Sequence, residues 1–275
     1  MKKLRARHLA IFDLHIPHHV HLEEVYKFIR WYKPTDLIIG GDFLNLEWAS
    51  HWNAPDFPII GLSKLSNWLK EEFETGKEIL NTLRKVSNKD VVIYYIPGNH
   101  ENWLRQMVTK YPSLLDNVHL MNVDDINSET DFSSYSKQFL ALLLNSVLEL
   151  YKFKIKVLPL DVPLYLNRIY YIHGHQVRGM NPAKNAVEKF KKTIVFGHFH
   201  THSIYTSTSL IDSKEIHQGI CVPCLSNLDP GYISSLANNW LNGFYIANCY
   251  DDYFVSNVIP IINGKVSLLN GNLLS

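Results

Sequence analysis

The sequence predicts an α/β fold built around a parallel sheet, and two observations support this prediction. Short apolar segments typical of buried strands alternate with longer segments that have the apolar spacing of helices. Short polar motifs follow several of these strands at the point where each strand ends. Because open α/β sheets bind ligands at the carboxyl ends of their strands, this placement is the one expected of a catalytic or binding site.

The N-terminal part of the chain shows the alternation most clearly. The apolar run at 8–12 ends at Asp13, and a second run at 37–39 continues into Gly40 and Gly41. Residues 62–86 have apolar side chains at helical spacing, and the β-branched and aromatic run at 91–96 stops at a proline and a glycine. The elements expected in this part are strand 8–12, helix 22–32, strand 37–39, helix 62–86, strand 91–96 and helix 101–110.

The rest of the chain changes from mixed elements to strands. Residues 127–137 are polar and rich in serine, so a loop is expected there. From Ser203 onward strands dominate, and a second sheet built from them and packed on the first is the simplest way to bury them. The elements expected are helix 138–151, strands 155–158, 164–166 and 169–172, helix 183–191, and strands 193–196, 204–207, 215–220, 244–249, 254–261 and 265–268. With no internal repeat and no linker, we expect a single domain over residues 1–275, with an inserted or capping segment at 112–152.

Composition and charge exclude several classes of protein. The 275 residues are 46% hydrophobic and 19% charged, as in ordinary globular proteins. No apolar run reaches the ~18 residues that a membrane span needs, so we expect a cytoplasmic protein with no membrane partner. The net charge is +1, and beyond the N-terminus there is no long basic run, which argues against extensive binding of duplex DNA. Histidine is abundant, with 14 residues, and it is the commonest metal ligand.

The three cysteines argue against a disulfide scaffold. Cys221 and Cys224 form a lone C-x-x-C, whereas structural zinc requires four ligands. A redox role is the alternative, but a thioredoxin-like context is missing. We expect two small buried residues on or near a strand.

Five short motifs follow strands in a fixed order, and together they are specific. They are Asp13–His15, Gly41–Asp42, Gly98–Glu101, His173–Gly174 and Gly197–His200. Any one of them occurs by chance in many proteins, and a lone buried histidine is more often structural than a ligand. Two divalent ions about 4 Å apart can clamp a displacement at phosphorus. A carboxylate between two such ions offsets their charge, and imidazole and amide groups can complete ligand shells that suit Mn²⁺, Fe or Zn²⁺ better than Ca²⁺.

In this order the motifs D-x-H, G-D, G-N-H-E, H-G and G-H-x-H resemble those of calcineurin-like metallophosphoesterases. The resemblance implies a four-layer α/β/β/α sandwich of two mixed sheets, with the site at the sheet edges. It also implies two divalent ions, Mn²⁺ first and Fe, Zn²⁺ or Ni²⁺ as alternatives, and a hydroxide between them that attacks phosphorus. Carried over by motif position, one metal would be held by Asp13, His15 and His200, the other by Asn99, His173 and His198, with Asp42 bridging them and His100 facing the substrate as the catalytic residue.

Some branches of this superfamily fit less well than others. The segment after Asp42 reads Phe43-Leu44-Asn45, so the arginine of the protein serine/threonine phosphatases is absent. UDP-diacylglucosamine hydrolases carry arginine where His100 stands. The stretches DLHIP and GNHENWLR are most similar to phage and prophage members, and a phage-encoded enzyme would act in the host cytoplasm.

The substrate is less constrained by the sequence than the metals are. His175, Arg105 and His18 are candidate substrate contacts. A solvated role is the simpler interpretation for Arg105 and His18, whereas for His175 a contact with phosphate or a place beside the ligands stands even with a structural role. Trp48, Trp52 and Trp103 follow motif loops and could stack on a base, with core or rim packing preferred. The function expected is hydrolysis of a phosphodiester in a nucleotide or single-stranded nucleic acid. A phosphomonoesterase and a non-catalytic metal-binding scaffold are the alternatives, and no oligomeric state is predicted.

Overall fold

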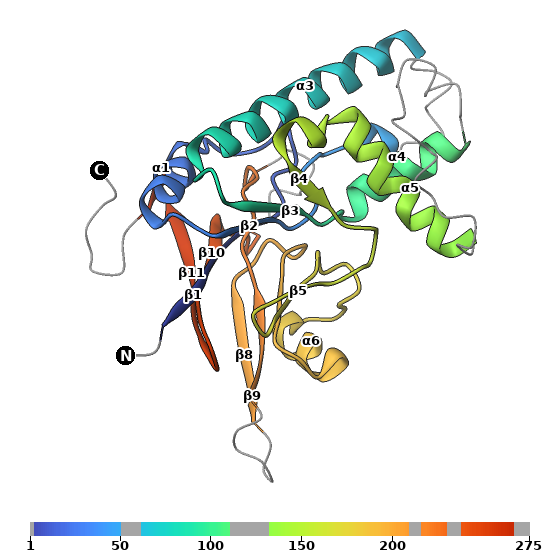
Figure 1. Ribbon diagram of the computed structural model, residues 1–275. Helices are drawn as coiled ribbons and strands as arrows, with labels where there is room; N and C mark the ends of the chain where they lie inside the picture. The colour runs from blue at the N-terminus through green and yellow to red at the C-terminus, as the bar shows by residue number, and fades with distance from the viewer. Residues whose placement is uncertain (1–2, 51–61, 111–131, 209–215, 230–237, 267–275) are drawn as a thin grey trace.

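The computed structural model describes residues 3–50, 62–110, 132–208, 216–229 and 238–266, which form two sheets packed face to face with helices outside them (Figure 1). The first sheet has seven strands in the order β12-β11-β10-β1-β2-β3-β4. The second sheet has five strands in the order β5-β6-β7-β9-β8. Among the described residues, no helix combines the length and the apolar character needed to cross a bilayer.

The first sheet is parallel on one side and antiparallel on the other. Its parallel strands are β1 (Leu4–Ile11), β2 (Asp36–Ile39), β3 (Val92–Tyr95) and β4 (Ile155–Val157). Its antiparallel strands are β10 (Gly243–Tyr250), β11 (Phe254–Ile262) and β12 (Lys265–Val266). The parallel register pairs Leu9 with Leu37 and Leu37 with Ile93, so the carboxyl ends of β1, β2 and β3 lie at one edge.

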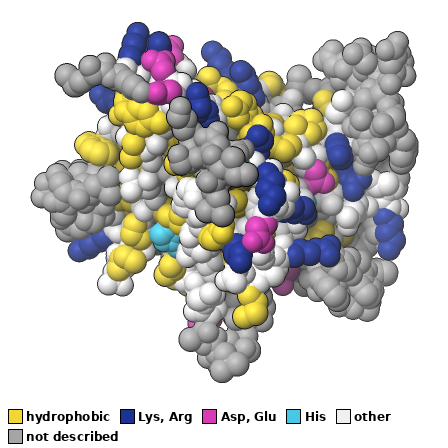
Figure 2. All heavy atoms as spheres, turned by 90° about the horizontal axis from the view of Figure 1, so that it is seen from below, with side chains coloured by type: hydrophobic (Ala, Val, Ile, Leu, Met, Phe, Trp, Pro, Cys, Tyr) yellow, Lys and Arg dark blue, Asp and Glu magenta, His cyan; other side chains and the backbone are white. Residues whose placement is uncertain are grey.

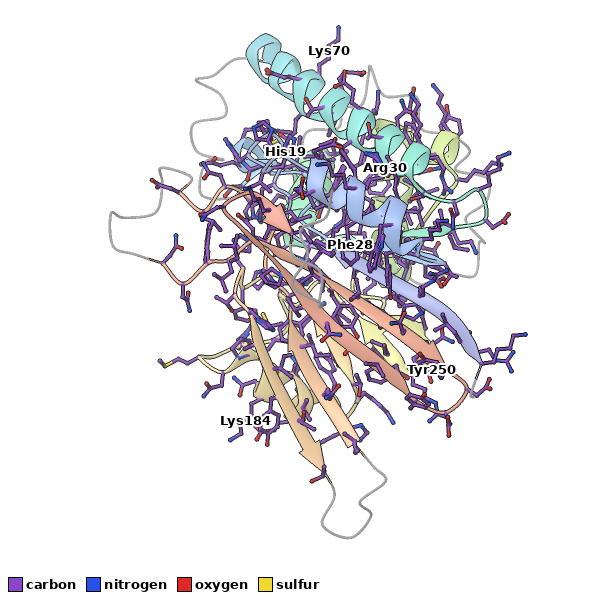
Figure 3. The ribbon with its side chains drawn as sticks, turned by 90° about the vertical axis from the view of Figure 1, so that its left-hand side faces the viewer. His19, Phe28, Arg30, Lys70, Lys184 and Tyr250 are labelled. Atoms are coloured by element: carbon purple, nitrogen blue, oxygen red, sulfur yellow. The ribbon has the colours of Figure 1, made fainter. Side chains whose placement is uncertain are left out.

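Four helices cover the outer face of the first sheet. They are α1 (Glu23–Tyr32), α3 (Leu62–Val86), α4 (Asn99–Lys110) and α5 (Phe132–Val147), and short 3-10 helices occur at Glu47–Ala49 and Leu150–Phe153. In α1, the side chain of Phe28 points toward the sheet, with its ring centroid 4.8 Å from that of Phe244, while Arg30 lies on the outer side and pairs with Glu23 (Figure 3). The amphipathic spacing predicted these helices because one face of each must be buried.

The second sheet combines strands from the middle and the end of the chain. It contains β5 (Leu164–Leu166), β6 (Ile169–Tyr171), β7 (Ile194–Phe196), β8 (Ser203–Thr208) and β9 (Ile216–Cys221), with α6 (Pro182–Phe190) on its outer face. Apolar side chains such as Phe12, Tyr171 and Val195 fill the space between the sheets. The resulting order of helices, sheet, sheet and helix confirms the predicted α/β/β/α architecture.

Two sequence-based predictions about the elements were wrong. The C-terminal strands do not all belong to the second sheet, because β10, β11 and β12 extend the first sheet beside β1. Alternating apolar residues identify a strand but not its neighbour, and β10 is apolar on both faces because both are buried: Phe244 faces the helices and Tyr245 faces the second sheet. The predicted loop at 127–137 is helical from residue 132, since serine is well tolerated in the first turn of a helix.

The predicted inserted segment at 112–152 is described only from residue 132. That part forms α5 and the 3-10 helix after it, and Leu140, Leu143 and Leu144 are buried in the core beneath the helices. Three further parts of the prediction lie outside the described residues: residues 111–131, the end of the last strand at 267–268, and Trp52. A capping role for this segment stays a prediction.

Gly219 allows α6 to pack directly on β9. A Cβ at this position would lie 2.0 Å from the carbonyl oxygen of Ala183, so Gly219→Ala must move the helix away from the strand. We expect a loss of about 1–3 kcal/mol in the free energy of unfolding, the usual result of overpacking, measured by urea denaturation. Thr208→Ala, an exposed position on β8, is the control. An unchanged unfolding midpoint for Gly219→Ala would show that α6 can move away from β9 with little loss of stability.

Candidate metal centre

Polar side chains from both sheets meet where the parallel strands end. The first sheet contributes residues that follow β1, β2 and β3, and the second contributes residues that follow β6 and β7. Parallel strands bring their carboxyl ends to one edge, so loops far apart in sequence become neighbours. The seven predicted metal ligands form one connected cluster: Asp13, His15, Asp42, Asn99, His173, His198 and His200.

Asp42 lies at the middle of this cluster and is buried. Its Oδ2 is 3.1 Å from Nε2 of His173, 3.8 Å from Nε2 of His100 and 4.0 Å from Nε2 of His15. Its Oδ1 accepts a hydrogen bond of 2.9 Å from the backbone N–H of His100. Burial alone would raise the pKa of Asp42, but His173 and His100 outweigh it and hold the pKa well below its ordinary value. Asp42 is therefore a carboxylate that faces imidazoles from three loops.

Asp13 has an oxygen with nothing to bind among the described residues. Its Oδ2 accepts the backbone N–H of His198 at 2.7 Å, but the buried Oδ1 has no hydrogen-bond partner in the described part of the chain. That Oδ1 is 3.7 Å from Nε2 of His200, which itself lies 3.1 Å from Nε2 of His15. A buried acceptor without a donor is costly, and a cation at this point would satisfy it.

Among the described residues, the convergent atoms form three groups that could hold a metal ion. Within each group the candidate ligand atoms lie within 4.8 Å of one another. The groups are Asp13 with His15 and His200, Asp42 with His173 and His198, and His15 with Asp42 and His100. The first two match the two predicted ligand sets apart from the amide of Asn99, whose Oδ1 is 3.0 Å from Nε2 of His173. The third shows that His100 lies beside Asp42 and His15.

The protonation of two of the histidines suits metal binding. Burial, reinforced by neighbouring His100, lowers the pKa of His15 to about 3, and burial with His173 lowers the pKa of His198 to about 4. Both imidazoles are therefore neutral at pH 7, which is the form that donates a lone pair to a metal. Burial also lowers the pKa of His173, but the Asp42 carboxylate outweighs burial and raises this pKa to about 9.

The backbone of the cluster is unusual in a way that is typical of functional sites. Asp13, His15, Asp42, His198 and His200 all have positive φ, between 46° and 69°, which L-residues rarely adopt. Gly98 leaves room for the side chain of Asp42, because a Cβ at position 98 would lie 2.1 Å from Oδ1 of Asp42. The residue types, the orphaned oxygen and this cradle together fit a pair of divalent cations.

Glu101 is a residue of the site to which the sequence assigned no role. Its fully buried carboxylate accepts the backbone N–H groups of Asp42, Phe43, Leu44 and Gly98 at 2.7–3.1 Å, and the hydroxyl of Tyr95 at 2.9 Å. Burial, with Asp42 adding to it, raises the pKa of Glu101, while these donors act in the opposite direction. A sequence signal did exist, because a glutamate at the third position of a helix can bond back to the N-cap, here Gly98.

The loop before the 3-10 helix at Glu47–Ala49 is held by another buried acid, Glu72 of α3. Its Oε1 accepts the backbone N–H of Leu46 at 2.8 Å, and its Oε2 accepts the indole Nε1–H of Trp48 at 3.2 Å. Burial raises the pKa of Glu72 to about 7. No sequence pattern singles out this residue, since one more acid on the polar face of a helix carries no signature. Trp48 packs against the core, in agreement with the preferred interpretation of that residue.

The three candidate substrate residues lie in different environments. His175 is at the edge of the cluster, with its ring centroid 5.6 Å from that of His173 and its Nε2 bonded to Asp161 at 2.9 Å. Arg105 donates to Asn102 of its own helix at 2.7 Å. His18 has an exposed side chain, and its carbonyl accepts the N–H of Asn227 at 2.8 Å. A substrate contact stays a prediction for each.

Cys221 and Cys224 are buried free thiols. Burial raises the pKa of both to about 12, so neither is a thiolate at pH 7. Their burial agrees with the expected structural role.

The chain was also compared with known proteins. No protein-family model and no curated protein matches it. Similar solved structures include a single mutant of Vps29 from Entamoeba histolytica, with 12% identity and a TM-score of 0.45 over 95% of this chain and 96% of that chain. Vps29 from Chaetomium thermophilum has 10% identity and a TM-score of 0.43 over 98% and 95%. A dimetal phosphatase from Danio rerio has 12% identity and a TM-score of 0.43 over 93% and 96%. Similarities this low carry no argument about function, which must rest on the site.

Glu101→Gln should weaken the centre without touching a ligand side chain. Either orientation of the glutamine places an NH₂ group against backbone N–H donors that now bond to a carboxylate oxygen. We expect metal affinity to fall about 10–100-fold and unfolding free energy by about 1–3 kcal/mol, measured by calorimetric metal titration and urea denaturation. Glu78→Gln, an exposed glutamate of α3, is the control. Wild-type affinity and stability in Glu101→Gln would refute the positioning role.

Proposed function

We propose that this protein is a binuclear metal-dependent phosphoesterase of the calcineurin-like type. The observation that carries the proposal is the convergence of one buried carboxylate, Asp42, with histidines from loops of both sheets, beside a second buried carboxylate whose outer oxygen has no partner among the described residues. The order of the motifs along the chain supports the same proposal independently.

Each residue of the cluster has a role that follows from its chemistry. Asp13, His15 and His200 would hold one cation, and Asn99, His173 and His198 the other, with Asp42 shared between them. When bound, two divalent cations supply the positive charge that offsets phosphoryl oxygens and lowers the pKa of an attacking water. Mn²⁺ is the metal proposed, because oxygen and imidazole donors suit it, with Fe, Zn²⁺ and Ni²⁺ as alternatives.

His100 is proposed to act on the substrate. Its Nδ1 lies against the carbonyl oxygen of Asn45, and because a carbonyl can only accept, Nδ1 must be the donor in that bond. Nε2 is then the nitrogen that faces the cluster, 3.8 Å from Oδ2 of Asp42. With both ring nitrogens protonated, Nε2 can donate to a phosphoryl oxygen or give its proton to the leaving oxygen, and the neutral ring that remains is the Nδ1–H tautomer.

A phosphodiester in a nucleotide or a short single strand is the proposed substrate. Aromatic rings lie beside two of the histidines, since Trp103 is 3.9 Å from His100 and Trp240 is 4.2 Å from His200 between ring centroids. Such rings can stack on a nucleobase. On the described residues of the face drawn in Figure 2, lysines and arginines lie in separate groups among acidic and apolar side chains, which suits a short substrate better than a long duplex.

The proposal is tested by comparing metal-loaded and EDTA-treated protein on a panel of esters. The panel contains bis-p-nitrophenyl phosphate, p-nitrophenyl phosphate, cyclic nucleotides, and short single-stranded DNA and RNA. We expect hydrolysis only with metal, and a higher kcat/KM for diesters than for monoesters. Preference for the monoester would make the protein a phosphatase. Metal binding without hydrolysis of any ester would instead support the scaffold and overturn the proposal.

His100→Ala should retain both metal equivalents while kcat falls about 10²–10⁴-fold on an ester with an alkoxide leaving group. A p-nitrophenyl ester should be less affected, because its leaving group needs no proton. Metal analysis and the two rate ratios measure this, with His21→Ala, an exposed histidine, as the control. Equal losses on both esters would assign His100 to stabilising phosphoryl oxygens. Loss of one metal equivalent would show that it is a ligand.

A further inference from the structure

One peptide group connects a buried acid of α3 to the imidazole proposed to face the substrate. The N–H of Leu46 donates to Oε1 of Glu72 at 2.8 Å, and the carbonyl of Asn45, which belongs to the same peptide group, accepts from Nδ1 of His100. Because a peptide group is planar and its C=O and N–H point in opposite directions, fixing one end fixes the direction of the other.

The surroundings hold this peptide group in one orientation. Asn45 is 5% exposed and its N–H donates to the carbonyl of Ile16 at 3.0 Å. Leu46 is fully buried and has φ of 46°, a backbone conformation that costs energy for a leucine. Glu72 is 5% exposed and also accepts from Trp48, so its carboxylate cannot turn away without leaving two donors unsatisfied. The strained turn at Leu46 is thus held by Glu72.

Glu72 also affects the strength of the bond to His100. A carboxylate that accepts from a peptide N–H polarises the peptide and makes its carbonyl oxygen a better acceptor, since hydrogen bonds in series reinforce one another at low dielectric. The carbonyl of Asn45 therefore favours the imidazole tautomer with the proton on Nδ1. That tautomer leaves Nε2 facing Asp42 and the cluster.

We infer that Glu72 is a positioning residue for His100, acting through the peptide group between Asn45 and Leu46 to fix the tautomer and direction of the imidazole. The inference rests on the proposed function for its catalytic consequence, but the tautomer itself can be observed without any reaction. The chemistry resembles that of a histidine oriented directly by a carboxylate, with one peptide group placed between the two.

The first measurement is the ¹⁵N spectrum of the His100 imidazole in the full-length protein loaded with diamagnetic Zn²⁺. We expect the Nδ1–H tautomer in the wild type and a shift toward Nε2–H in Glu72→Ala. Glu72→Met, which keeps the volume but has no acceptor oxygen, replaces Glu72→Ala if the alanine variant does not fold. An unchanged Nδ1–H tautomer in the folded variant would overturn the inference, whether or not the wild type hydrolyses any ester.

The second measurement is the rate, for which a purely structural role makes a different prediction. Glu72→Ala should lower kcat about 10–100-fold, as does removal of a group that orients a functional histidine. The double variant with His100→Ala should be no slower than His100→Ala alone, since Glu72 acts only through that ring. Losses that multiply in the double variant would overturn the inference. An inactive wild type would instead refute the proposed function and leave the spectrum to decide on Glu72.

Three variants serve as matched controls for these measurements. Glu72→Gln keeps an oxygen that can accept from Leu46, so it should restore the tautomer and keep kcat within a few-fold of the wild type. Trp48→Phe removes only the other donor to the carboxylate and should leave the His100 spectrum unchanged. Glu71→Ala removes an exposed charge from the same helix. A tautomer shift in Trp48→Phe or Glu71→Ala equal to that in Glu72→Ala would contradict the specific path through Leu46.

Discussion

The structure of the site depends on one buried carboxylate that binds no ligand, that of Glu101. It accepts hydrogen bonds from the loop after β2, from the loop after β3 and from Tyr95 on β3, so it joins two neighbouring strand ends and the start of α4 at a single point. A neutral side chain could not satisfy so many donors, since only a carboxylate is an acceptor at both of its oxygens. Its bond with the backbone N–H of Asp42 helps to fix the position of the carboxylate that the histidines surround.

Electrostatics explains why the cluster is suited to cations rather than to the packing of a core. Asp13 and Asp42 are both buried, and desolvation opposes the charge of each, yet nearby imidazoles keep the pKa of both low. The compensation is incomplete, because Oδ1 of Asp13 has no hydrogen-bond partner in the described part of the chain. Strained backbone at the same residues shows that stability has been given up locally for this arrangement of charges. Glu101 and Glu72, which are not ligand candidates, accept hydrogen bonds from the strained backbone at Asp42 and Leu46 and so help to hold it.

One physical reason explains which parts of the molecule could be predicted from the sequence. Ligand candidates were found because metal binding needs particular side chains placed directly after strands, as in Asp13 after β1 and His198 after β7. The roles of Glu101 and Glu72 were not predicted, because their partners are mainly backbone N–H groups, which every residue but proline carries. The position of β10 in the first sheet was not predicted, because the pairing of Leu4 with Tyr250 joins residues far apart in the sequence. No local pattern encodes such a pairing.

The same pairing has a consequence for how the molecule is made. β1 is an interior strand of the first sheet, and β10, the strand that covers one of its edges, is synthesised only after the residues between them, 12–242. At about 5–20 residues per second, β1 leaves the ribosome on the order of 10–50 s before its partner. During that interval β1 has an open edge. His173, His198 and His200 of the second sheet are also synthesised long after β1. The proposed metal centre therefore gains its last ligands well after β1 has been made, and a chain truncated before His173 would have both an unpaired strand edge and an incomplete set of proposed ligands.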